Sequence, residues 1–141
     1  LAQSEKRFRA LVENAGDAIF LKDEQGRILD VNQQACENLG YTRDELLNMT
    51  VQDVDTTWTR ARFAEMAKKL KLGQVLTGIS MHKRKDGSTF PIEARIGLIE
   101  FGDQRLVLAL VRDMTERIEA EQRDKQLREE LAHASRLTTM G

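Results

Sequence analysis

Residues 84–93 read Arg84-Lys85-Asp86-Gly87-Ser88-Thr89-Phe90-Pro91-Ile92-Glu93, and this stretch decides how the second half of the chain folds. Asp86-Gly87 is a dipeptide well suited to a tight hairpin turn. The flanking segments, Val75 to Met81 and Thr89 to Ile99, have the character of long strands. Pro91 cannot donate a hydrogen bond to a sheet ladder, so it is expected near a strand start or at a bulge. The stretch therefore predicts an antiparallel hairpin.

Three more strands complete the expected sheet. Gln104 to Met114 is a third long strand, joined to the hairpin through Phe101-Gly102-Asp103. Closer to the N-terminus, Ala18 to Leu21 and Ile28 to Val31 are short strands separated by a glycine-containing turn. All five strands can pair antiparallel in one sheet with helices on one face. The expected fold class is α/β of the α+β kind.

Helix signals lie between the second and third strands. Asn32 is placed to cap a helix that Gly40 ends. Thr42 starts another short helix through a Thr-x-x-Glu capping box. Residues 49–56 are weakly patterned, whereas the apolar spacing from Thr57 to Leu72 predicts a longer helix.

The two ends differ from this central part. Residues 1–14 are expected to form an amphipathic helix, residues 15–115 the main domain, and residues 116–141 a charged helix. Within the last segment, Leu127, Leu131, Ala134 and Thr138 follow the spacing of a short heptad seam. Pairs of opposite charge four residues apart, Glu119 with Arg123 and Glu121 with Lys125, are expected to stabilise the helix.

Composition limits the function classes. Hydrophobic residues make up 40% of the chain, which suits a packed domain, and the net charge of -1 favours neither nucleic acid nor an anionic membrane. One cysteine, Cys36, excludes an intramolecular disulfide and a multi-cysteine metal site. The chain has no apolar run long enough to cross a bilayer. No nucleophile–base pair, phosphate loop or metal cluster stands out, so no enzymatic activity is expected of this chain itself.

Five motifs in order resemble the PAS domain family: residues 13–19, residues 26–28 followed by residues 31–32, residues 39–46, residues 84–93 and residues 111–117. The resemblance implies a PAS fold, with a five-stranded antiparallel sheet and helices on one face, followed here by a long coiled-coil helix. Residues 131–141 resemble the start of a histidine kinase dimerisation helix. In that family the phospho-accepting histidine lies beyond the Met-Gly, so His133 is expected to be a solvated helix residue.

The resemblance implies a cytoplasmic sensory module. It would form a homodimer and relay a signal through the coiled coil, controlling autophosphorylation by kinase domains of the same chain that act on a response regulator. The parent protein could still be membrane-anchored. The alternatives are a ligand-free dimerisation module and a PAS sensor of a cyclic-dinucleotide signalling enzyme.

No cofactor or metal is predicted, although an unidentified small ligand remains open. The family's haem-binding members carry a histidine on the long helix, and residues 57–72 contain none. The family's covalent flavin-binding members use a cysteine after the Gly-Tyr segment, and residues 48–55 contain none. The candidates to line a ligand cavity are Cys36, Trp58, Phe63, Met66 and Met81, although plain core packing explains them more simply.

Two further groups of residues are expected to carry function. Asp113 and Thr115 stand where the last strand becomes the final helix, and Thr115 is expected to be the N-cap of that helix. In the PAS family this Asp-x-Thr junction passes strain from the sheet to the coil. The expected dimer seam consists of Phe8, Leu11, Leu127, Leu131 and Ala134.

Overall fold

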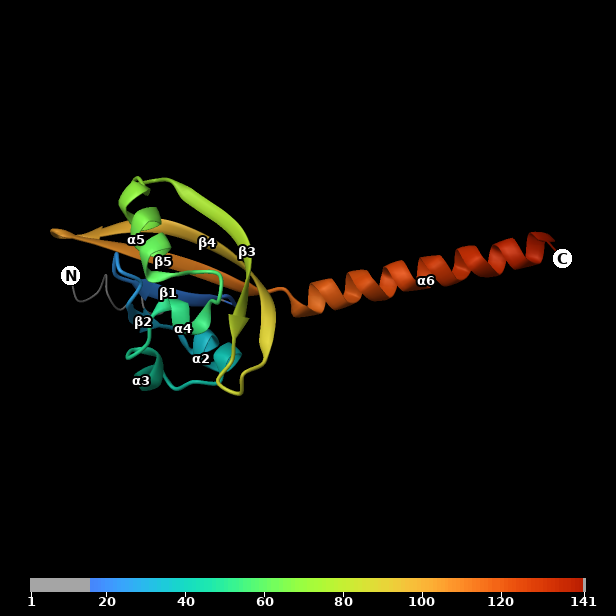
Figure 1. Ribbon diagram of the computed structural model, residues 1–141, viewed down its shortest axis with the longest axis horizontal. Helices are drawn as coiled ribbons and strands as arrows, with labels where there is room; N and C mark the ends of the chain where they lie inside the picture. Colours follow the sequence, from blue (N-terminus) through green and yellow to red (C-terminus); the bar gives the residue numbers. More distant parts are fainter. Residues whose placement is uncertain (1–15, 141) are drawn as a thin grey trace.

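The computed structural model describes residues 16–140, so the helix expected over residues 1–14, with Phe8 and Leu11, lies outside the described residues. Figure 1 shows one domain from which a single long helix extends. In chain order the elements are β1 (Ala18–Lys22), β2 (Ile28–Val31), α2 (Gln33–Leu39), α3 (Arg43–Leu46), α4 (Val51–Val54), α5 (Arg60–Lys69), β3 (Val75–Lys83), β4 (Thr89–Phe101), β5 (Gln104–Asp113) and α6 (Thr115–Met140).

The five strands form one antiparallel sheet in the order β2-β1-β5-β4-β3. The central strand β5 pairs with β1 on one side and with β4 on the other. Strand β3 is an edge strand of the sheet and pairs with β4, and its His82 also forms an isolated antiparallel bridge with Asp55. The expected fold, a five-stranded antiparallel sheet with helices on one face and a long C-terminal helix, is confirmed.

The core lies between one face of the sheet and the short helices. Strand register aligns Ala18 with Val111 and Phe20 with Ala109, and all four side chains are buried. Because side chains alternate along a strand, these residues define the inner face of the sheet. Helices α2 to α5 add their own buried residues to the same cluster, among them Phe63 of α5.

Local capping explains where the short helices begin. Asn32 accepts a hydrogen bond from the Ala35 amide at 3.1 Å and, in addition, one from the Ile19 amide of β1 at 2.9 Å. It therefore caps α2 and joins this helix to the sheet. Thr42 begins α3 through the expected capping box with Glu45.

Several boundaries differ from expectation. The weakly patterned residues 49–56 contain α4, which begins with a Thr50–Asp53 capping box. Helix α5 is shorter than residues 57–72 because Thr59 caps it, and Thr57 is instead bonded to Asp55. Strand β4 continues through Phe101, which pairs with Gln104, so the connection to β5 is only Gly102-Asp103.

The turn between β1 and β2 packs tightly against the helical layer at Gly26. Its φ of 89° lies in the left-handed region that glycine adopts readily. The Val51 amide donates to the Gly26 carbonyl at 2.8 Å, which holds α4 against the turn. A Cβ at this position would lie 2.7 Å from Val51 Cγ1 and 3.2 Å from Phe63 Cδ1. A side chain at residue 26 would therefore force Val51 to shift where the hairpin meets the helical layer.

We predict that Gly26→Ala lowers the free energy of unfolding by about 3 kcal/mol, because left-handed strain and overpacking add together. Urea unfolding measures the loss. The matched control is Gly73→Ala, because Gly73 has a similar φ of 85° with nothing within 4 Å of the added Cβ. That variant should lose only about 1 kcal/mol. An equal loss of unfolding free energy in the two variants would show that the close packing at Gly26 does not contribute to stability.

Candidate functional site

A lysine lies on the inner face of the sheet, among aromatic side chains. Lys22 continues the alternation of Ala18 and Phe20, so it points into the core, and it is only 5% exposed. Its Nζ lies 5.3 Å from the centre of the Phe20 ring and 5.6 Å from that of Phe63. Among residues 16–140 no carboxylate lies within 4 Å of it. Burial lowers the pKa of Lys22 to about 8, and the charge of Asp55 opposes this shift in part.

The nearby carboxylate of Asp55 is also buried, at 3% exposure. It follows α4 and accepts hydrogen bonds from the Thr57 amide (2.9 Å), the Thr57 hydroxyl (2.6 Å) and the Ser80 hydroxyl of β3 (2.7 Å). Burial alone would raise the pKa of Asp55. The interactions with His82, Thr57 and Ser80 together outweigh burial and lower this pKa to about 2, so the carboxylate is ionised at neutral pH.

His82 of the edge strand completes this group, which we call the buried polar cluster (Lys22, Asp55 and His82). It is 4% exposed, and its Nε2 lies 3.6 Å from Asp55 Oδ2. The imidazole makes edge contacts with Phe20 and Phe90, with ring centres 5.9 Å and 6.0 Å away. The cluster brings β1, the end of α4 and β3 together, and it holds ionisable groups in an apolar core.

The structure gathers four of the five candidate cavity residues around the core. Cys36 and Phe63 are buried, and Trp58 and Met66 pack against the same cluster while partly exposed. Met81 does not join them. It is 38% exposed, because it neighbours the inward-facing His82 on β3 and so points to the opposite face of the sheet.

The junction between β5 and α6 differs in detail from expectation. Thr115 is the first residue of α6 and not its N-cap. Asp113 Oδ1 accepts hydrogen bonds from the Thr115 amide (2.8 Å) and the Thr115 hydroxyl (2.6 Å), so Asp113 supplies the side chain that caps the helix. The Met114 carbonyl accepts the first helical hydrogen bond, from Ile118. The side chain that caps α6 is therefore that of Asp113, and Thr115 is the residue whose amide and hydroxyl it binds.

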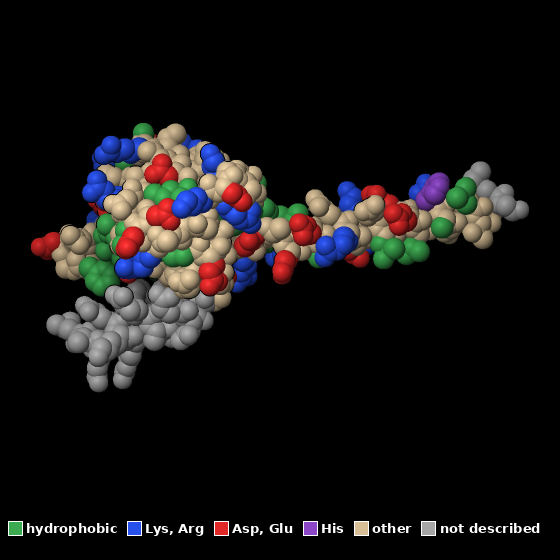
Figure 2. Space-filling view, turned by 90° about the horizontal axis from the view of Figure 1, so that it is seen from below, with side chains coloured by type: hydrophobic (Ala, Val, Ile, Leu, Met, Phe, Trp, Pro, Cys, Tyr) green, Lys and Arg blue, Asp and Glu red, His purple; other side chains and the backbone are tan. Residues whose placement is uncertain are grey.

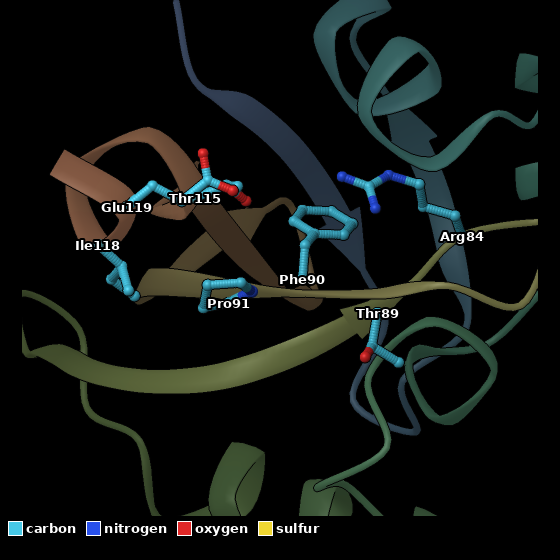
Figure 3. A pocket seen from close by; sticks show the side chains of 7 residues that line it. All are labelled: Arg84, Thr89, Phe90, Pro91, Thr115, Ile118 and Glu119. Atoms are coloured by element: carbon cyan, nitrogen blue, oxygen red, sulfur yellow. The ribbon is translucent and has the colours of Figure 1, made fainter. Parts of the chain in front are cut away.

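A surface pocket of about 270 Å³ lies beside this junction (Figure 3). Its walls come from the β3–β4 connection, the start of β4 and the first turns of α6. The lining residues are Arg84, Thr89, Phe90, Pro91, Thr115, Ile118 and Glu119. The guanidinium of Arg84 stacks over Phe90, with its carbon 4.1 Å from the ring centre. The pocket therefore touches both the sheet and the helix that leaves it.

The sequence patterns alone did not point to the buried polar cluster. Lys22 follows the apolar run of β1 in step with Ala18 and Phe20, and this alternation was a signal for a core-facing lysine. Asp55 lies in the weakly patterned stretch, and His82 follows the predicted strand Val75 to Met81 without belonging to any of the sequence motifs. No local pattern joins these two, because 26 residues separate them and only the fold brings them together.

The described residues show no group of three His, Cys, Asp or Glu side chains arranged to hold a metal ion. None of the described helices has the length and apolar character that crossing a bilayer requires. The chemistry that the buried polar cluster supports is proton uptake and release at Lys22, whose pKa of about 8 lies close to neutral pH.

We predict that Lys22 makes stability depend on pH in the alkaline range. Its pKa is about 8 in the folded state and 10.5 ordinarily, so below pH 8 the full cost of the buried charge is present. As the pH rises from 8 to 10.5, the folded state loses the proton first. Wild-type stability should therefore rise relative to Lys22→Met, by up to about 3 kcal/mol.

Urea unfolding of both proteins across this range provides the measurement, and Lys83→Met, at an exposed lysine of β3, controls for the loss of one positive charge. Parallel stability curves for wild type and Lys22→Met would contradict the assignment.

Comparison with known proteins places this geometry in a family. A PAS domain profile matches residues 16–116. The chain is 30% identical over 122 residues to the methyl sulfide methyltransferase-associated sensor of Methanosarcina acetivorans, covering 86% of this chain. It is 30% identical to the sensor protein FixL of Bradyrhizobium diazoefficiens and 29% identical to the sensor histidine kinase TmoS of Ectopseudomonas mendocina, each match covering all of this chain. The chain spans 12%, 29% and 15% of the lengths of these relatives.

A weaker likeness, 26% identity over the whole chain and 13% of the relative, links it to the probable diguanylate cyclase DgcE of Escherichia coli. Among solved structures, the PAS domain of an HTR-like protein from Haloarcula marismortui superposes with a TM-score of 0.72 at 27% identity, covering 79% of this chain and 93% of that domain. The profile covers most of the chain. The chain therefore belongs to the PAS domain family.

Proposed function

We propose that this chain senses a signal in its PAS domain and relays it through α6 to control autophosphorylation of a histidine kinase. The observation that carries the proposal is the junction at Asp113 and Thr115, where a sheet strand and the start of a long helix share one capping carboxylate. The likeness to the sensor histidine kinase TmoS over the full length of the chain supports the kinase as the output. The kinase domains and a response regulator would be the downstream partners.

The junction couples the sheet to the helix through short contacts. Asp113 pairs with Ile92 in the β4–β5 ladder, and the Met114 amide donates to the Pro91 carbonyl at 2.9 Å. A movement of β5 relative to β4 would therefore shift both the cap and the first turn of α6. Such a relay requires a stimulus that binds two arrangements of the domain with different affinity.

Helix α6 has the surface of a helix that needs a partner. Figure 2 shows hydrophobic side chains exposed between charged ones along it. Leu127 and Leu131 are 55% and 61% exposed, and Ala134 is exposed on the same seam. We propose that α6 pairs in parallel with a second copy, burying this seam in a homodimeric coiled coil. The N-terminal residues Phe8 and Leu11 would strengthen the same dimer.

Two alternatives differ from this proposal in stimulus or in output. A ligand-free dimerisation module would use the same seam without a stimulus. A cyclic-dinucleotide enzyme as the output draws on the likeness to the diguanylate cyclase, whereas residues 131–141, which resemble a kinase dimerisation helix, favour the kinase. A cytoplasmic location and the lack of haem or flavin remain predictions. A visible absorption spectrum of the purified protein tests the second.

We predict that Asp113→Ala loosens the start of α6 without unfolding the domain. Losing the cap should cost about 1 kcal/mol and speed amide hydrogen exchange at residues 115–119 roughly fivefold, because these amides open locally. Exchange measured by NMR or mass spectrometry resolves the segment. Asp103→Ala, in the β4–β5 loop, is the control and should leave α6 unchanged. Unchanged exchange at residues 115–119 in Asp113→Ala would remove the basis of the relay.

We predict that replacing Leu127 and Leu131 together by Ser raises the dimer dissociation constant at least tenfold, because the seam loses its apolar contacts. Sedimentation equilibrium measures the constant. The matched control replaces Lys125 and Glu129 by Ser, which keeps the spacing and the net charge but lies on the opposite face of α6. The assignment of Leu127 and Leu131 to the dimer contact is wrong if both double variants dimerise as tightly as the parent.

A further inference from the structure

The pocket beside the junction presents a fixed cation. Arg84 donates from Nε to the Asn38 carbonyl and from Nη1 to the Ser88 hydroxyl, both at 3.2 Å, and stacks on Phe90. Within residues 16–140 its Nη2 donates no hydrogen bond. The guanidinium is therefore held in place by three contacts, and one edge stays available for a carboxylate.

The opposite wall of the pocket presents an unpaired anion. Glu119 was expected to pair with Arg123, but no ion pair within 4 Å is found for it in the described part of the chain. Its neighbours on α6 behave differently, because Glu121 pairs with Arg117 and Asp124 with Arg128. Figure 3 shows the Glu119 carboxylate directed into the pocket, on the other side of the Phe90 ring from Arg84.

Apolar side chains line the pocket between the two charges. Phe90 is buried at 2% exposure, and Pro91 and Ile118 are partly buried beside it. In Figure 3, Pro91 and Ile118 lie next to each other below the charged groups. The pocket thus offers one cation, one anion and an aliphatic wall, in a volume somewhat below that of sites for drug-sized ligands.

We propose that this pocket binds a small zwitterion, an aliphatic α-amino acid. Its carboxylate would pair with Arg84, its ammonium group with Glu119, and its side chain would lie on Pro91 and Ile118. A simple carboxylate would meet the like charge of Glu119, and a simple amine the like charge of Arg84, so a ligand with both charges fits best. The proposal goes beyond the relay, because such a site would bind its ligand whatever the output of the parent protein.

The experiment is an NMR titration of the chain with L-leucine, its amide, which lacks the carboxylate, and isovalerate, which lacks the ammonium group. L-leucine should cause saturable shifts in the amides of residues 84, 89, 90 and 115–119. Each analogue should bind roughly tenfold more weakly, because it loses one charge-assisted hydrogen bond.

Variants assign the two charges. Glu119→Gln should weaken L-leucine roughly tenfold and leave isovalerate no weaker, whereas Arg84→Gln should weaken L-leucine but not the amide. Glu119 is exposed on α6, so Glu119→Gln keeps the proposal testable even if Arg84→Gln disturbs the stack on Phe90. Glu129→Gln, far along α6, is the control and should bind like the parent. The proposal is overturned if L-leucine causes no saturable shift at its solubility limit, if isovalerate binds as tightly, or if Glu119→Gln binds L-leucine unchanged.

Discussion

The rest of the domain depends on the contacts that the buried carboxylate of Asp55 makes with its polar neighbours. An ionised carboxylate in an apolar core is costly unless it is paired and hydrogen-bonded. Asp55 meets this need through Thr57 in its own loop and through Ser80 and His82 on β3. The helical layer and the edge strand must therefore stay together for the charge to be tolerated. The same charge offsets part of the cost of burying Lys22.

Strand register carries this constraint toward the helix that leaves the domain. His82 pairs with Phe90 across β3 and β4, and their rings touch edge to face. Phe90 in turn supports Arg84 and forms a wall of the pocket beside α6. The buried polar cluster and the start of α6 are thus joined by packed side chains. Packing between these side chains does not by itself couple the cluster to α6, because a relay also needs an element that adopts two arrangements.

Helix α6 shows why such an element could lie at its start. Beyond its first turns the helix extends away from the domain, and its described side chains are largely exposed (Figure 1). Helices without tertiary packing are marginal in water. A cap and ion pairs along the surface contribute to the stability of α6, and the proposed coiled-coil partner would add to it. Asp113 supplies the cap, and Arg117–Glu121 and Asp124–Arg128 supply ion pairs. In the proposed relay, a small change at this cap would alter the stability of the first turn of α6.

The sequence by itself determined the five strands, the Asp86-Gly87 hairpin, the caps at Asn32 and Thr42, and the final helix, because each depends on residues close together in the chain. It also carried the family motifs. Only the tertiary structure decided that Lys22, Asp55 and His82 meet, that Met81 faces away from the core, and that Glu119 turns into a pocket instead of toward Arg123. These outcomes depend on strand register and on contacts between distant segments, which no local pattern encodes.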